Sequence, residues 1–246
     1  MEWALTTKEP ARAEFDRFAG DYEDLLKDPV REYFAPGSDF FVTRKLEVLD
    51  AVAAKLGRDL RTATWLDVGC GKGQLLRAGR SRFARAVGCD LSADMLKECA
   101  DLEVVRQVEE DRLPFAEATA DWVTAVCVYH HVDPPTRARL TSEIRRVLRP
   151  GGVFAVIEHN PLNPAVQVIV RRTPVDAHAQ LMTAGAVRRE LRRGGFEIAA
   201  TRYLLLVPQS LYRACGWIER AAEALPLGGQ HCVVGVKRET PATPGR

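Results

Sequence analysis

The sequence predicts a doubly wound α/β fold, with a mainly parallel sheet covered by helices on both faces. Two observations lead to this prediction. Short apolar segments alternate with helix-forming segments from about residue 64 to residue 160, as in strands joined by right-handed helical crossovers. The first of these apolar segments runs into WLDVGCGKG, residues 65–73, where an acid precedes three alternate glycines. A strand, a glycine-rich loop and a helix N-terminus together form a cradle for a nucleotide-like ligand.

The spacing of the glycines separates the known classes of nucleotide-binding loop. Glycine lets the backbone approach a ligand closely, where a β-carbon would clash. A dinucleotide-binding loop, G-x-G-x-x-G, needs its third small residue at position 74, which is Gln74. A P-loop needs Ser or Thr after its lysine, whereas Gly73 follows Lys72. The pattern Asp-x-Gly-x-Gly-x-Gly of residues 67–73 instead resembles motif I of the class I S-adenosylmethionine (SAM) methyltransferases.

The second apolar segment, residues 85–89, ends at Asp90. Ser92 is placed to cap a helix that begins near residue 93. An acid at the end of the second strand of a βαβ unit can accept two hydrogen bonds from vicinal ribose hydroxyls. Asp90 is therefore predicted to bind the ribose of the cofactor. Asp67, at the end of the first strand, is predicted to hold the glycine loop and to reach the amino group of the ligand directly or through water.

The segment EEDRLPF, residues 109–115, is similar to a third segment of the same superfamily. In that superfamily the leading acid accepts a hydrogen bond from the adenine amino group, and the next N–H meets a ring nitrogen. The resemblance assigns these roles to Glu109 and to the backbone of Glu110, although the register leaves Glu109, Glu110 and Asp111 open as the adenine contact. The predicted cofactor residues are Asp67, Gly69, Cys70, Gly71, Gly73, Asp90, Leu91, Met95, Glu109, Glu110, Asp111 and Cys127.

Later segments complete the resemblance. Residues 120–132 and 143–157 resemble motifs of the type 11 group, which includes quinone C-methyltransferases and many natural-product O- and N-methyltransferases. The resemblance covers about residues 12–240 and implies a Rossmann-like sheet of seven strands, the last one antiparallel. It also implies a single methyltransferase domain over residues 1–246. The segment EHNPLNP, residues 158–164, looks like a signature of one bacterial subgroup, whose substrates the resemblance does not fix.

Three segments outside the central pattern are predicted to cover the ligands. Amphipathic helices are predicted at 12–27 and at about 39–56, and in this family such helices commonly form a lid, here residues 12–56. Residues 161–182 leave the carboxyl edge of the sheet, where open α/β sheets bind ligands. Together with residues 207–229 they are predicted to cap the substrate. The candidate substrate residues are Tyr22, Tyr129, Arg171, Arg172 and His178; the arginine pair either grips an acidic group or is simply solvated.

Three of the five histidines lie at the predicted ends of the fourth and fifth strands. The candidate catalytic residues are His130, His131, Glu158 and His159. Methyl transfer from a sulfonium is a direct displacement, so the enzyme mainly aligns the nucleophile and the methyl group. A hydroxyl acceptor must also lose its proton, and imidazole suits this near neutral pH. His130 or His131 is the predicted general base, with His130 the first choice and Glu158 orienting it. The alternative is that the histidine pair only shapes the pocket.

Composition narrows the possible partners. A net charge of +2 gives no general attraction to nucleic acid or to a membrane. No apolar run approaches the roughly 20 residues of a membrane span, and residues 1–11 are polar and charged, unlike a secretory signal. The six cysteines form no C-x-x-C pair and no cluster with histidine, so we expect reduced, buried thiols and no metal. A cytoplasmic monomer or homodimer is expected.

The sequence therefore predicts a SAM-dependent methyltransferase that methylates a small-molecule acceptor, with a hydroxyl preferred, in secondary-metabolite or glycan-related biosynthesis. One alternative is N- or C-methylation of a small molecule. Another is a SAM-fold protein that binds SAM without methyl transfer, as a regulator or a cyclase-like catalyst. A nucleic-acid or protein methyltransferase would need a basic groove or an added recognition domain, and the sequence has neither. The sequence does not name the acceptor.

Overall fold

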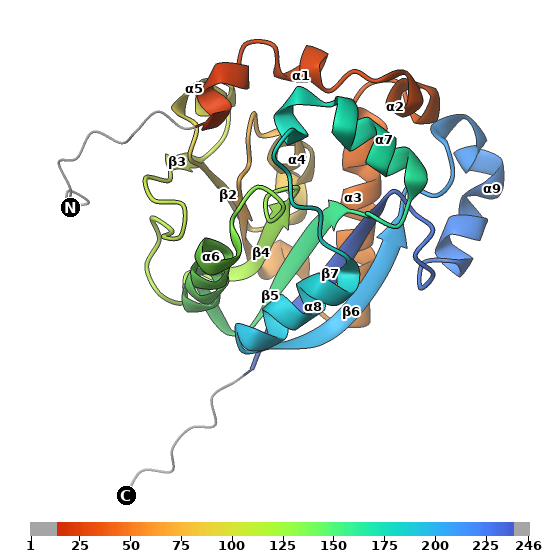
Figure 1. Ribbon diagram of the computed structural model, residues 1–246. Coiled ribbons are helices and arrows are strands. Elements are labelled where there is room, and N and C mark those ends of the chain that lie inside the picture. The colour runs from red at the N-terminus through yellow and green to blue at the C-terminus, as the bar shows by residue number, and fades with distance from the viewer. Residues whose placement is uncertain (1–13, 239–246) are drawn as a thin grey trace, which may run out of the picture.

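The computed structural model describes residues 14–238, and one sheet of seven strands forms its centre (Figure 1). The strands are β1 (Thr64–Val68), β2 (Arg85–Asp90), β3 (Val104–Arg106), β4 (Ala120–Val126), β5 (Leu148–His159), β6 (Phe196–Leu204) and β7 (Gln230–Lys237). Their order across the sheet is β3-β2-β1-β4-β5-β7-β6. Neighbouring strands are parallel except for β7, which is antiparallel to both β5 and β6. The predicted doubly wound sheet with an antiparallel last strand is confirmed.

Helices and short 3₁₀ turns connect the strands. The α-helices within the described residues are α1 (Tyr22–Leu25), α2 (Pro29–Phe34), α3 (Asp39–Lys55), α4 (Gln74–Gly79), α5 (Ala93–Leu96), α6 (Pro134–Val147), α7 (Pro164–Arg172), α8 (Ala184–Arg193) and α9 (Gln209–Ala221). Two of the 3₁₀ turns lie near the site described below, Glu14–Phe18 and Pro174–Asp176.

Helices pack on both faces of the sheet, so each strand contributes to two cores. On one face, α6 and α8 pack against strand residues such as Leu66 and Phe154. On the other face, α3 and α4 pack against Trp65 and Trp122. Successive strand residues point to opposite faces, and the strands at the centre of a parallel sheet are apolar on both. The strand ends are therefore where polar side chains can gather.

The chain winds outward from β1 in both directions, since β1 pairs with β2 on one side and β4 on the other. In open α/β sheets the ligand lies in the crevice at this point, outside the carboxyl ends of the strands. Asp67 and Asp90 lie near the ends of β1 and β2, and His159 ends β5. His130 and His131 follow β4 after a few residues. The predicted site residues thus come to one edge of the sheet.

The two predicted N-terminal helices had different outcomes. The helix expected at about 39–56 is α3, and that prediction is confirmed. The continuous helix expected over 12–27 is wrong, because its described part forms the 3₁₀ turn 14–18 and the short α1, with Gly20 between them. Glycine in a helix interior costs about 1 kcal/mol relative to alanine, which favours a break there. Residues 12–13 lie outside the described residues, as do residues 1–11, which carry the expectation of no secretory signal.

Two further expectations concern membrane spans and thiols. Within residues 14–238, none of the helices has the length and hydropathy needed to cross a bilayer. All six cysteines are free, and four of them are buried. The thiols therefore behave as small apolar side chains, as the sequence predicts.

Candidate active site

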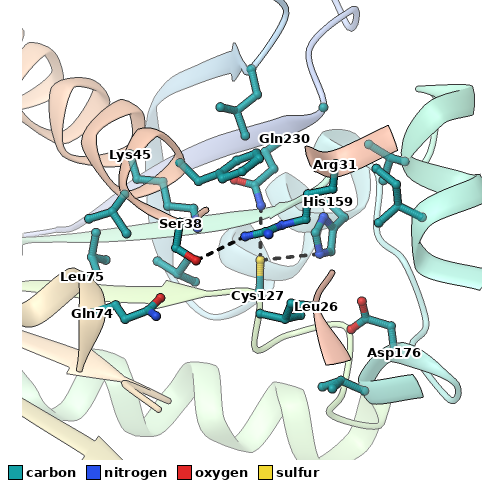
Figure 2. Close-up of a pocket in the computed structure, with 18 of the residues that line it drawn as sticks. Leu26, Arg31, Ser38, Lys45, Gln74, Leu75, Cys127, His159, Asp176 and Gln230 are labelled. Carbon is teal, nitrogen blue, oxygen red and sulfur yellow. Dashed lines mark hydrogen bonds between the residues drawn. The ribbon is translucent and has the colours of Figure 1, made fainter. Parts of the chain in front are cut away.

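A cavity of about 370 Å³ lies at the carboxyl edge of the sheet. It is lined by the glycine loop, by the lid helices α1 to α3, by the ends of β4 and β5, and by both cap insertions. Figure 2 shows Lys45, Gln74 and Leu75 on one side of it and His159 and Asp176 on the other, with Cys127 between them. One cavity thus joins the predicted cofactor loop to the predicted catalytic strand ends.

The glycine loop needs glycine for two different reasons. Gly73 precedes α4 with φ of +71°, and a β-carbon there would lie 2.3 Å from Leu102. Gly71 also has a positive φ, +52°, but the position of its β-carbon is open, and Gly71 lines the cavity. Gly73 is therefore favoured by its positive φ and by the packing of Leu102 against it. Gly71 instead leaves free space beside the backbone, where a bound ligand can approach.

Asp67 is a buried carboxylate beside this loop. Its Oδ1 accepts a hydrogen bond of 2.5 Å from the Thr124 hydroxyl, which in turn accepts one of 2.8 Å from the Trp65 indole. Burial raises the pKa of Asp67 to about 7, although the hydroxyl bond and the Lys45 ammonium both oppose that rise. Asp67 and Lys45 line the same cavity. The loop end of the cavity therefore carries the Asp67 carboxyl group and the Lys45 ammonium group, which are close enough to interact electrostatically.

Asp90 is held by the backbone around it. Its two carboxylate oxygens accept the N–H groups of Gly71 and Ser92, each at 2.8 Å. Burial raises the pKa of Asp90, and these hydrogen bonds partly oppose the rise. The Ser92 hydroxyl also donates to Asp16 at 2.6 Å, so the 3₁₀ turn 14–18 packs against the start of α5. Asp90, Leu91 and Met95 do not line the cavity, and their cofactor contacts stay predictions.

The segment predicted to contact adenine is on the surface. Glu109 and Glu110 are exposed, and their carbonyls accept hydrogen bonds of 2.8 and 3.0 Å from the Gln107 side chain. Asp111 pairs with Arg139 on α6. The side chain of Gln107 thus shapes the backbone of this turn. None of the three acids lines the cavity, so the adenine contact stays a prediction with its register open.

The histidine end of the cavity contains a buried ionic cluster. Nδ1 of His130 forms a hydrogen bond with the Glu158 carboxylate, and Nε2 of His130 lies 3.4 Å from Oδ1 of Asp176. Glu158 also accepts the N–H groups of residues 128 and 129, at 3.1 and 2.7 Å. Burial alone would lower the pKa of His130, but the two carboxylates outweigh it and raise the pKa well above its usual value. His130 is therefore a charged imidazolium between two carboxylates.

His131 and His159 have the opposite character. Both line the cavity, whereas His130 does not. Burial, followed by repulsion from the charged His130, lowers the pKa of each to about 4. A base must be uncharged and must reach the acceptor. The geometry therefore moves the candidate base from His130, the first choice from the sequence, to His131 or His159.

The ligand atoms of His130, His131 and Asp176 lie within 4.8 Å of one another. Such a group can hold a metal ion, since imidazole nitrogens and carboxylates are zinc ligands. The arrangement equally suits a metal-free site, in which His130 is protonated and lies between the carboxylates of Glu158 and Asp176. Cysteine spacing gives no information on this group, because its members are two histidines and Asp176. The expectation of a metal-free protein thus stays a prediction, which elemental analysis of the purified protein tests.

Several candidate substrate residues do not reach the cavity. Tyr129 is buried in the core, where its hydroxyl lies 2.9 Å from that of Thr141 on α6, and we withdraw it as a substrate contact. Arg171 and His178 are exposed and do not line the cavity. Arg172 pairs with Asp28 at 3.6 Å. The basic pair therefore belongs to the surface, and Arg172 links the cap helix α7 to the lid.

Tyr22 and Cys127 do line the cavity. Burial raises the pKa of the Tyr22 hydroxyl above its usual range, which keeps it protonated. Cys127 has φ of +56°, and its Sγ accepts a hydrogen bond of 3.4 Å from Gln230 and lies 3.8 Å from Nε2 of His159. Burial raises the pKa of its thiol to about 11, so it stays neutral. Cys127 thus lies between the loop end and the histidine end of the cavity.

Three cavity residues were missed by reasoning from the sequence. Lys45 lies on α3, where a lysine among apolar residues is normally solvated. Arg31 on α2 donates to Ser38 at 3.4 Å and lies 4.6 Å from the centre of the Phe41 ring. Asp176 lies far along the chain from the histidines that it contacts. Only the folded arrangement brings these charges to the cavity.

Comparisons with known proteins show which family and relatives this chain is similar to. A family described as a methyltransferase domain matches residues 66–156. The trans-aconitate 2-methyltransferase of Azoarcus sp. is 34% identical over 152 residues, 60% of this chain and 57% of that protein. The fatty-acid O-methyltransferase of Mycolicibacterium smegmatis is 34% identical over 180 residues, 68% of this chain and 62% of that protein. The chain thus spans less than two thirds of the length of these relatives.

Residues 66–156 of this chain match the type 11 group of class I SAM-dependent methyltransferases. Its fold is also that of a solved SAM-dependent methyltransferase from Thermotoga maritima, described as a possible histamine N-methyltransferase. That structure has a TM-score of 0.66 and 17% identity, over 91% of this chain and 98% of that one. The family implies SAM as the cofactor, and the relatives differ in their acceptors.

Proposed function

We propose that this protein transfers a methyl group from SAM to a hydroxyl group of a small-molecule acceptor. The observation that carries the proposal is that one cavity is lined both by the glycine loop and by the uncharged imidazoles of His131 and His159. Donor and acceptor can therefore meet in one cavity. The O-methyltransferase among the relatives supports oxygen as the nucleophile.

The loop end of the cavity fits the methionine part of SAM. That part carries a carboxylate and an ammonium group, and this end of the cavity offers the ammonium of Lys45 and the carboxylate of Asp67. The open space beside Gly71 lets a ligand approach the backbone. Asp90 would bind the ribose, since each of its oxygens keeps a lone pair beyond its single backbone hydrogen bond. When bound, SAM supplies an electrophilic methyl group on a sulfonium.

The histidine end of the cavity would prepare the acceptor. A hydroxyl aligned with the methyl group needs a base, and we assign that role to His131 or His159 because both line the cavity and are uncharged. Asp176 lies 3.4 Å from Nε2 of His131 and would stabilise the imidazolium that forms. His130 and Glu158 would act as positioning residues. Apolar lid residues around the cavity would exclude water from the reacting groups.

The compartment is also part of the proposal. Six free cysteines suit a reducing environment, so we place the protein in the cytoplasm, acting on secondary-metabolite or glycan-related intermediates. No added domain for nucleic acid is proposed, since the net charge is only +2.

The test combines cofactor binding with product detection. Calorimetry should detect SAM binding that Asp90→Ala weakens strongly, and S-adenosylhomocysteine should be released when a hydroxylated acceptor is supplied. Mass spectrometry of the product then identifies the methylated atom. Methylation at nitrogen or carbon would replace the hydroxyl assignment. SAM binding without product from any panel of acceptors would favour the regulator or cyclase-like alternative, and absence of SAM binding would overturn the proposal.

A further inference from the structure

The two cap insertions expose several large apolar side chains. Of the ten large hydrophobic side chains exposed within residues 14–238, seven belong to segments 161–182 and 207–229. On α9, Leu211, Trp217 and Ile218 are 55, 62 and 40% exposed. We call these three side chains, together with the exposed Leu162, Leu225 and Leu227, the α9 patch. Single exposed hydrophobic residues are ordinary, but a group on two adjoining segments marks an interaction surface.

The inner contacts of α9 fix which of its faces is outward. The buried Glu219 carboxylate accepts a hydrogen bond of 2.8 Å from Arg44 on α3. The same Arg44 guanidinium lies 4.4 Å from the centre of the Tyr212 ring. Since Tyr212 and Glu219 face inward, the exposed Trp217 lies on the far side of the helix, and Leu211 and Ile218 lie along its flank. Figure 1 shows α9 at the edge of the molecule, outside the sheet.

The two cap segments that carry the α9 patch also line the cavity. The Asn163 side chain donates to the carbonyl of Leu227 at 3.0 Å, so the two insertions touch. Asn163 lines the cavity, while its neighbour Leu162 is exposed. Gly229, two residues after Leu227, also lines the cavity. An apolar molecule on the patch therefore has a short path into the cavity along these two segments.

The exposed charges on α9 are positive, and Glu223, which follows the helix, pairs with Arg202. Arg213 and Arg220 are exposed on α9, whose single acid is the buried Glu219. Arg171 is exposed on α7, beside the lid. A helix with a leucine, tryptophan and isoleucine face flanked by arginines is typical of segments that lie in the plane of a bilayer surface. Arginines there pair with anionic head groups, and tryptophan favours the boundary between head groups and acyl chains.

We propose that the α9 patch rests on an anionic lipid surface, from which an apolar acceptor enters the cavity. The first part concerns binding of the protein to lipid and does not depend on methyl transfer. The second part rests on the proposed function and names its acceptor class, a membrane-resident molecule with a hydroxyl. The interaction is peripheral, with side chains of the patch inserted and no helix crossing the bilayer.

The test uses the full chain and vesicles of two compositions. Vesicles containing phosphatidylglycerol and phosphatidylcholine in equal parts should pellet the protein, and pure phosphatidylcholine should bind it about tenfold more weakly. The double variant L211E/I218E should lose about tenfold or more in affinity. R213Q/R220Q should lose mainly the preference for the anionic vesicles. The matched control is V105E, since Val105 is also exposed but lies on β3, at the opposite edge of the sheet from β6.

A spectroscopic readout places the contact. Trp65 and Trp122 are buried, so in a W3F background Trp217 is the exposed indole that vesicles can affect. Its emission should shift to the blue on vesicle binding, and SAM affinity should show that each variant is folded. If L211E/I218E misfolds, the vesicle binding of R213Q/R220Q and the Trp217 emission still test whether the α9 patch contacts lipid.

Three results would overturn the proposal that the α9 patch binds a lipid surface. The first is no vesicle binding by the wild-type chain, and the second is binding that neither double variant weakens. The third is a vesicle-free dimer that L211E/I218E dissociates, because the patch would then join two copies of the chain. Vesicle binding without release of S-adenosylhomocysteine would instead support lipid binding by the α9 patch and count against the proposed function.

Discussion

Nε2 of His131 lies 3.4 Å from Oδ1 of Asp176, so the segment after β4 and the cap insertion meet at one carboxylate. The same oxygen lies 3.4 Å from Nε2 of His130. Asp176 therefore contacts a charged imidazole that is buried and a neutral one that faces the cavity. The position of the cap is in this way tied to the histidines that the proposed reaction uses.

Replacing His131 by glutamine removes one of the two candidate bases without changing the charge at neutral pH. If His131 accepts the proton, kcat with a hydroxyl acceptor should fall about 100-fold, the usual size of such a contribution. The Kd for SAM should stay within about twofold, because His131 is not among the residues predicted to bind the cofactor. Release of S-adenosylhomocysteine and calorimetry measure the two quantities.

The control for this prediction is His178→Gln, since His178 is exposed and outside the cavity. The corresponding loss in His159→Gln, with His131→Gln fully active, would assign the base to His159. Full activity of both variants would remove the base from the mechanism and favour a role of the histidines in shape alone.

Replacing His130 by alanine should damage stability rather than chemistry alone. The change leaves the buried Glu158 carboxylate without its imidazolium partner. Breaking one side of a buried ion pair costs about 3–5 kcal/mol, so the free energy of unfolding should fall by that order. Urea denaturation measures it. Glu158→Gln in the alanine background should recover part of the loss, and a fully stable His130→Ala protein would contradict the buried pair.

The sequence predicted the sheet well because its signals are local. The glycine loop, the acid at Asp90 and the alternation of apolar segments each depend on a few adjacent residues. Tyr129 failed because a spacing argument does not give the direction of a side chain after a strand has ended. Asp176 was missed because its contacts come from chain segments far apart in sequence, and Lys45 because its exposure depends on how α3 packs. The charge state of His130 likewise depends on those distant carboxylates.

Two single substitutions in the glycine loop should separate packing from ligand binding. Gly73→Ala forces a positive φ on alanine and a contact of 2.3 Å with Leu102, so it should lower the free energy of unfolding by about 1–3 kcal/mol. Gly71→Ala also strains a positive φ, yet its β-carbon meets open space. That variant should fold with a smaller loss and bind SAM at least about tenfold more weakly. Unaltered SAM affinity in Gly71→Ala would mean that the ligand lies elsewhere.

The pKa of Asp67 gives the affinity for SAM a pH dependence. Burial raises this pKa to about 7, against the opposing effects of the Thr124 hydrogen bond and the Lys45 ammonium and with a smaller contribution from Asp90. Below pH 7 the free protein therefore holds a proton on Asp67 that the unfolded chain would have lost. The ammonium group of SAM favours the carboxylate form, so binding below pH 7 must release that proton.

The affinity for SAM should therefore rise with pH. As the pH rises from about 5.5 to 7.0, less free energy is spent on removing the proton, and the affinity for SAM should increase about tenfold. Calorimetry across this range measures the change, and proton release appears as a dependence of the observed heat on the buffer. Asp67→Asn keeps the hydrogen bond with Thr124 possible but cannot ionise, so its weaker affinity should be flat over the same range. A wild-type affinity that is flat from pH 5.5 to 7.0 would show that Asp67 does not face the ammonium group of the cofactor.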